Sequence, residues 1–200
     1  MPKKTQKSNK NRLGGKRNLP PVPAPSAISY RGRIPVNNSE SGAVATLRRA
    51  FQVTTNGSGL YAATQTYDPS GCDNWTEYST IWEEYRVLGI RYEYYPTFTV
   101  NTGTVGGGLM VNSIMHTLVS PSPGNITEAY SYGDSRVGNV FKPFVREWKM
   151  SEVGEAEFVK TSTPATDQYT LMTYIDQGGA SIAYGVVFCN YLIQFRTLRK

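Results

Sequence analysis

Residues 185–195 read Gly-Val-Val-Phe-Cys-Asn-Tyr-Leu-Ile-Gln-Phe, and their alternation is the clearest structural signal in the chain. One face of this stretch is apolar along almost its whole length: Gly185, Val187, Cys189, Tyr191, Ile193 and Phe195. The opposite face is mixed and includes Asn190, Gln194 and Arg196. Because successive side chains of a strand point to opposite faces, this pattern predicts a strand that covers a packed core.

Similar stretches precede it, separated by turn residues. Residues 47–53 alternate in the same way, and Asn56-Gly-Ser-Gly59 predicts a turn before a second run over 60–67. In a longer run, Leu88, Ile90, Tyr92 and Tyr94 are expected on one face, with Val87, Gly89, Arg91 and Glu93 on the other, ending at Pro96. Further extended runs are predicted at 105–111, 137–148 and 169–175. Pro143 interrupts the second of these and indicates an edge or a bulge.

Helical signals are few. Asn74-Trp-Thr-Glu77 and Asn125-Ile-Thr-Glu128 each resemble an N-cap followed by an acidic residue at the third helical position. They predict short loop helices that end near Trp82 and Tyr132. Roughly eight strands and two short helices in about 155 residues predict a single all-β domain, either a two-sheet sandwich or a barrel.

Charge is distributed very unevenly along the chain. Residues 1–33 contain nine basic residues and no acidic residue: Lys3, Lys4, Lys7, Lys10, Arg12, Lys16, Arg17, Arg31 and Arg33. Residues 34–200 contain twelve basic and fifteen acidic residues, a net charge of −3. The basic character of the protein therefore belongs to an N-terminal arm and not to the body.

The composition of this arm predicts disorder and binding to a polyanion. Like charges repel, and the polar residues between them cannot bury enough apolar surface to offset the entropy of ordering. Leu19-Pro-Pro-Val-Pro-Ala-Pro-Ser26 predicts an extended spacer. We therefore expect a basic arm and linker over 1–33, a folded domain over 34–200, and phosphate contacts from the nine basic residues. A solubilising or targeting tail is the alternative.

Signs of catalysis or of a strong metal site are absent from the sequence. His116 is the single histidine, and there is no phosphate-binding or nucleophile-elbow motif. Cys72 and Cys189 lie far apart, which fits free, reduced thiols in an intracellular product. Asp68 and Asp73 flank a turn and offer a weak Ca²⁺ alternative, so the metal sites stay unknown and no cofactor is required. No apolar run is long enough to span a membrane.

The layout of basic arm, proline-rich linker and single all-β domain resembles the capsid proteins of small non-enveloped icosahedral viruses. Within that group it is similar to satellite tobacco necrosis virus and to the shell domains of sobemovirus- and tombusvirus-like capsids. The local likeness lies in Trp82-Glu-Glu-Tyr-Arg-Val-Leu-Gly-Ile-Arg-Tyr-Glu-Tyr-Tyr-Pro96, and in residues 185–195 as a final strand. The likeness covers the order of elements along the whole chain, without a short diagnostic motif.

The resemblance implies an eight-stranded jelly-roll sandwich that assembles into a closed icosahedral shell, with arms that point inward to the genome. It also implies a virion component without enzymatic activity and with single-stranded RNA favoured over DNA. Shells of roughly 60 or roughly 180 subunits are both open, and Ca²⁺ at subunit interfaces is unassigned.

Two other classes compete with the capsid interpretation. A ribosomal-type nucleic-acid-binding β-domain with a basic tail would be expected to carry basic and stacking residues across its body, whereas this body is acidic on balance. A carbohydrate-binding or enzymatic β-sandwich would suit the fourteen tyrosines, but no acid–base pair of suitable pattern is visible.

Overall fold

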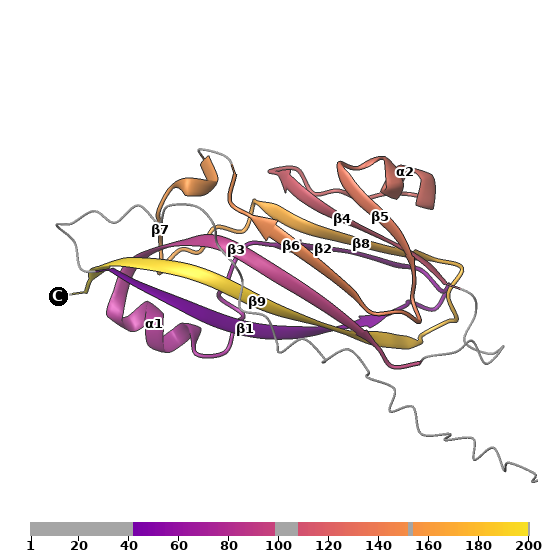
Figure 1. Ribbon diagram of the computed structural model, residues 1–200, viewed down its shortest axis with the longest axis horizontal. Coiled ribbons are helices and arrows are strands. Elements are labelled where there is room, and N and C mark those ends of the chain that lie inside the picture. The colour runs from indigo at the N-terminus through magenta and orange to yellow at the C-terminus, as the bar shows by residue number, and fades with distance from the viewer. Residues whose placement is uncertain (1–41, 99–107, 152–153, 200) are drawn as a thin grey trace, which may run out of the picture.

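The computed structural model describes residues 42–98, 108–151 and 154–199, which form two β-sheets packed face to face (Figure 1). The predicted arm and the first residues of the predicted 34–200 domain lie outside these ranges. The strands are β1 (Gly42–Thr54), β2 (Tyr61–Thr66), β3 (Trp82–Pro96), β4 (Leu109–Thr117), β5 (Asp134–Asn139), β6 (Phe144–Lys149), β7 (Val159–Lys160), β8 (Tyr169–Asp176) and β9 (Ala183–Leu198). The helices are α1 (Trp75–Ile81), α2 (Ile126–Ser131) and the 3₁₀ turn η1 (Gly154–Ala156).

The strand order identifies the jelly roll. One sheet runs β1-β9-β3-β6, with the two-residue β7 beside β3, and the other runs β2-β8-β4-β5. With β7 set aside, the first long strand pairs with the last, the second with the seventh, the third with the sixth and the fourth with the fifth. All of these pairs are antiparallel. This nested pairing confirms the predicted all-β, eight-stranded jelly-roll sandwich.

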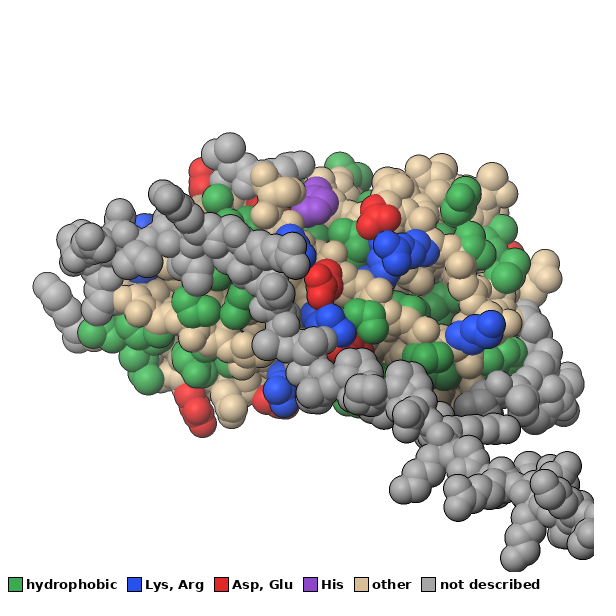
Figure 2. All heavy atoms as spheres, viewed as in Figure 1, with side chains coloured by type: hydrophobic (Ala, Val, Ile, Leu, Met, Phe, Trp, Pro, Cys, Tyr) green, Lys and Arg blue, Asp and Glu red, His purple; other side chains and the backbone are tan. Residues whose placement is uncertain are grey.

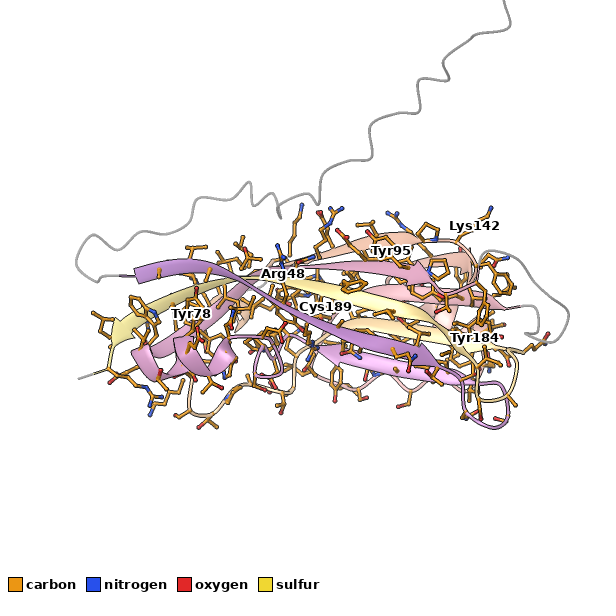
Figure 3. All side chains as sticks on the ribbon, turned by 90° about the horizontal axis from the view of Figure 1, so that it is seen from below. Arg48, Tyr78, Tyr95, Lys142, Tyr184 and Cys189 are labelled. Atoms are coloured by element: carbon orange, nitrogen blue, oxygen red, sulfur yellow. The ribbon has the colours of Figure 1, made fainter. Side chains whose placement is uncertain are left out.

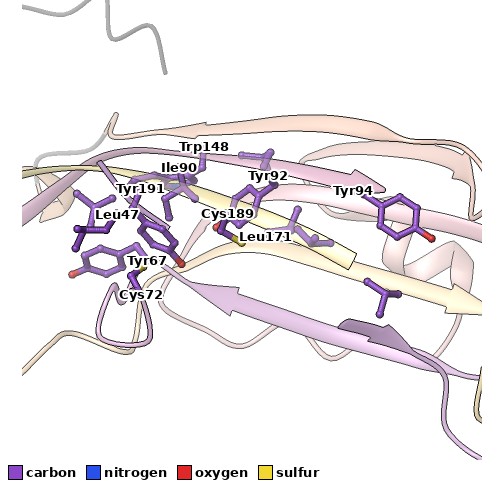
Figure 4. Close-up of a cluster of buried hydrophobic side chains, with 14 of the residues drawn as sticks. Leu47, Tyr67, Cys72, Ile90, Tyr92, Tyr94, Trp148, Leu171, Cys189 and Tyr191 are labelled. Carbon is purple, nitrogen blue, oxygen red and sulfur yellow. The ribbon is translucent and has the colours of Figure 1, made fainter. Parts of the chain in front are cut away.

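The core forms where the two apolar faces predicted from alternation meet. Leu47 pairs with Tyr191, and Phe51 pairs with Val187, so the inward faces of β1 and β9 coincide. The alternating residues of β9 from Gly185 to Phe195 are buried, as predicted. Aromatic side chains fill the space between the sheets, and Tyr92, Trp148 and Tyr191 are almost fully excluded from solvent (Figure 4).

The predicted face assignment in β3 is wrong for the first half of the strand. Tyr85 and Val87 belong to the same buried cluster as Ile90, Tyr92 and Tyr94, although strict alternation places Val87 on the opposite face. A register shift between Val87 and Gly89 in the pairing with β9 explains the change. An extra residue at a bulge inverts the alternation, so both halves of β3 turn their large side chains inward.

The predicted single run over 137–148 is two strands in different sheets. β5 pairs with β4 in one sheet and β6 pairs with β3 in the other, and Pro143 lies in the connection between them. The predicted run over 105–111 begins only at Leu109 within the described residues, because 99–107 lie outside them. Gly108 packs closely there, since a Cβ at this position would lie 2.8 Å from Val140.

Both predicted loop helices exist, but only one has the predicted cap. The Asn125 side chain accepts a hydrogen bond from the Glu128 backbone nitrogen at the start of α2. Asn74, in contrast, has a φ of 64° and no side-chain cap hydrogen bond. Its left-handed conformation turns the chain from the Asp68–Gly71 turn into α1, so Asn74 acts through its backbone, which asparagine tolerates better than most residues.

A substitution at Gly185 tests how tightly β9 packs against the end of β3. A Cβ on Gly185 would lie 2.4 Å from the Tyr95 carbonyl oxygen and 2.5 Å from the Tyr94 ring. We expect Gly185→Ala to lower the free energy of unfolding by about 1 to 3 kcal/mol, because neither neighbour has room to move. Gly138→Ala in β5 is the control, since nothing lies within 4 Å of that Cβ. Chemical denaturation of both variants measures the difference, and equal stabilities would contradict this packing.

Candidate functional site

The outer face of the β1-β9-β3-β6 sheet carries an apolar patch formed by Tyr95, Val145 and Phe188. Glu93 of β3 pairs with Phe188 of β9 on one side and with Val145 of β6 on the other, which places these side chains in one row. Tyr95 lies edge to face with Phe188, with ring centroids 5.8 Å apart. Tyr95 is 52% exposed and Phe188 is 46% exposed. Figure 3 shows the molecule from the side of β1 and β9, with Tyr95 labelled.

Charged side chains lie within and beside this patch, since Glu93 stands between Val145 and Phe188. Arg91 lies 2.5 Å from a Glu93 oxygen and 2.9 Å from a Glu147 oxygen, and Lys149 lies 3.3 Å from the other Glu147 oxygen. The Lys149–Glu147 pair is the more exposed of these contacts and contributes little to folding stability. This outer face therefore combines exposed aromatic and aliphatic side chains with charged neighbours, a mixture that is found in protein–protein contact surfaces.

Large apolar side chains are also exposed elsewhere on the domain. They are Val44, Ile81, Leu109, Leu118, Val119, Tyr130, Val137 and Leu198. They belong to both sheets, to α1 and α2, and to the loop after β4. These residues give the domain apolar surface on several sides, where contacts with other protein surfaces can form.

His116 belongs to a polar cluster at the end of β4. Its Nδ1 lies 2.6 Å from Glu155 Oε1 and 3.3 Å from Ser151 Oγ, while its ring stacks on Trp148. The buried Glu155 also accepts hydrogen bonds from the Ser151 nitrogen and from Gln168. This arrangement links η1 and the start of β8 to β4 and indicates a structural role.

We expect His116→Ala to lower the free energy of unfolding by about 1 to 3 kcal/mol, because it removes a close partner of the buried Glu155 carboxylate. His116→Asn returns an amide near the Nδ1 position and should recover part of this loss. Thermal and chemical denaturation of the two variants provide the measurement. An alanine variant as stable as the native chain would show that Glu155 does not depend on this contact.

The nine basic residues predicted to bind nucleic acid all lie within residues 1–41, outside the described part of the chain. The sequence also offered Asp68 as a weak candidate Ca²⁺ ligand. Both oxygens of its carboxylate already accept hydrogen bonds from Ser70, one from the backbone nitrogen and one from the hydroxyl. Within residues 42–98, 108–151 and 154–199, no group of three or more candidate ligand residues could hold a metal ion.

Both cysteines are free and buried in the core. Burial raises the pKa of the Cys72 thiol and of the Cys189 thiol to about 12, so both stay protonated at neutral pH. Such thiols are poor nucleophiles, and they act here as small apolar residues. In the described residues no helix has the length and apolar character needed to cross a membrane.

No protein-family model and no curated protein sequence matches this chain. Solved structures do match it. Tobacco necrosis virus aligns with a TM-score of 0.61 at 10% identity, over 80% of this chain and 98% of that chain. A semi-empty virus-like particle of the giant freshwater prawn Macrobrachium rosenbergii nodavirus aligns with a TM-score of 0.57 at 14% identity, over 81% and 97%.

A 60-mer of the BFDV capsid protein also aligns, with a TM-score of 0.54 at 15% identity, over 80% of this chain and 96% of that chain. In all three comparisons nearly the whole of the solved chain is covered. The described domain therefore has the jelly-roll fold of the coat proteins of small icosahedral viruses.

Proposed function

We propose that this protein is the structural capsid protein of a small icosahedral virus. Many copies would assemble into a closed shell, and the basic arm would package single-stranded nucleic acid, with RNA favoured. The proposal rests on the nested strand pairing of the two sheets. It also rests on the structural matches, which cover nearly the whole of each solved virus chain.

Two further properties of the chain support assembly and packaging. The exposed apolar residues on several sides of the domain suit contacts with several identical neighbours. The charge asymmetry separates the two tasks, because a body of net charge −3 repels nucleic acid weakly while residues 1–33 attract it. The role is structural, in keeping with the His116 cluster, whose contacts serve to hold loops together.

Sedimentation velocity of the purified full-length protein tests this function, because a shell of dozens of subunits sediments far faster than one subunit. We expect one fast, uniform boundary with an absorbance ratio typical of bound nucleic acid. A ribosomal-type nucleic-acid-binding domain would instead sediment as a small species, alone or on short oligonucleotides. Monomers or dimers at every pH and salt concentration tried would rule out the capsid proposal.

A further inference from the structure

A groove of about 800 Å³ lies along the open edge of the sandwich, between the last part of β4 and the edge strands β5 and β6. Its titratable lining is Asp134, Arg136, Arg146, Glu147, Lys149 and His116. Figure 2 shows the face that carries these strands, where basic, acidic and histidine side chains gather close together. The shell function proposed above assigns no task to this groove.

Arg146 is the unusual member of this group. It lies on the inward face of β6, and only 2% of its side chain is exposed. Its Nη2 donates to the Asp134 carbonyl oxygen and lies 2.8 Å from the Asp134 carboxylate. Its Nη1 is buried without a hydrogen-bond partner among the described residues. A buried donor left unpaired is costly, so such a group commonly marks a position that a ligand or an ordered water fills.

The charges around Arg146 leave the groove with an excess of donors. Asp134 is engaged by Arg146, and Glu147 is shared between Arg91 and Lys149. Arg136 forms no ion pair with another described residue, although it is close enough to Arg146 to help burial lower the pKa of that guanidinium. Arginine stays charged despite such a shift, so two neighbouring cations line the groove while the Asp134 carboxylate pairs with only one of them, Arg146.

We propose that this groove binds a phosphate-class oxyanion, with Arg146 and Arg136 as its principal ligands and Lys149 at its rim. Guanidinium groups match the oxygens of phosphate with parallel N–H donors. Basic side chains line the groove from both β5 and β6, and several donors suit a tetrahedral anion with several oxygens better than a planar carboxylate, which one guanidinium satisfies. All residues of the site belong to one chain, so the site can be tested independently of the proposed capsid function.

The test uses inorganic phosphate as the probe and ³¹P NMR line broadening as the measure of binding. The full-length chain carries Gln at all nine basic arm positions, 3, 4, 7, 10, 12, 16, 17, 31 and 33, so that no arm side chain contributes a positive charge to phosphate binding. We expect saturable broadening that Arg136→Gln weakens about tenfold through loss of one charge-assisted hydrogen bond. Arg136 is exposed, so Arg136→Gln is expected to fold. It therefore tests the site even if Arg146→Gln, a change at a buried position, fails to fold.

Arg48→Gln is the matched control, because Arg48 is an exposed arginine on β1, away from the groove. Broadening that never saturates, or that Arg48→Gln reduces as much as Arg136→Gln does, would overturn the site. So would displacement of phosphate by an equal concentration of acetate, which would assign the groove to a carboxylate. Once phosphate binding is established, a single-stranded oligonucleotide is added. If the oligonucleotide displaces the phosphate, the natural ligand is a nucleic-acid backbone; if it does not, the natural ligand is free phosphate.

Discussion

Shells assembled from a chain with Gln at its seven basic arm positions 3–17 are expected to contain little or no nucleic acid. The substitutions remove seven of the nine positive charges of the arm and leave Arg31 and Arg33 beside a body of net charge −3. Each lost phosphate contact also loses the release of a condensed counterion, which provides most of the affinity for a polyanion. The ratio of absorbance at 260 and 280 nm of purified particles measures the loss, and any shells formed should be emptier or less regular.

The salt dependence of RNA binding identifies which part of the chain is responsible. For a single strand, the logarithm of the binding constant should fall by about 0.7 for each phosphate engaged per unit of log salt concentration. The glutamine variant should show a much shallower slope than the native chain. Replacing the arm lysines with arginine should have almost no effect, because no base-specific contact is involved. Equal slopes for the native and glutamine chains would move RNA binding to the β-domain.

Phe188→Asp should prevent assembly while the isolated domain stays folded. Phe188 is 46% exposed and lies outside the core, so folding loses little when it is replaced. Burying its ring against a second copy contributes about 2 kcal/mol per contact, and a carboxylate buried there without a partner adds a further penalty. The effect is multiplied over every contact of a closed shell. Sedimentation velocity measures assembly, and circular dichroism measures the fold.

Asn190→Asp is the matched control for Phe188→Asp. It adds the same charge two residues away on the same face of β9 but removes no apolar surface. Asn190 also pairs with Arg48 and Arg91, which accommodate a negative charge. We expect this variant to assemble. Normal shells from Phe188→Asp would show that the patch formed by Tyr95, Val145 and Phe188 faces solvent in the particle.

The sequence predicts most of the fold because alternation is a local property. The faces of β1, β8 and β9 and both loop helices follow from spacing alone. The bulge between Val87 and Gly89 does not, because it depends on the partner strand β9. The assignment of β5 and β6 to opposite sheets also depends on tertiary packing, and Pro143 marked only an interruption of the extended run.

The functional surfaces were predicted less completely. Alternation places Phe188 on the mixed, outward face of the last strand, where an aromatic residue is a signal of a contact surface. The buried Arg146 carried no such signal, because its burial depends on tertiary packing, including its contact with Asp134 of β5. The nine basic residues of the arm remain a prediction from charge alone.

Electron microscopy of the purified full-length protein tests the central claim most directly. Because the jelly-roll domain exposes apolar surface on several sides, we predict closed particles of a single diameter with internal density from packaged nucleic acid. Fields that contain only single subunits, small oligomers or irregular aggregates, over a range of pH and salt, would contradict the assignment of this chain as a capsid protein.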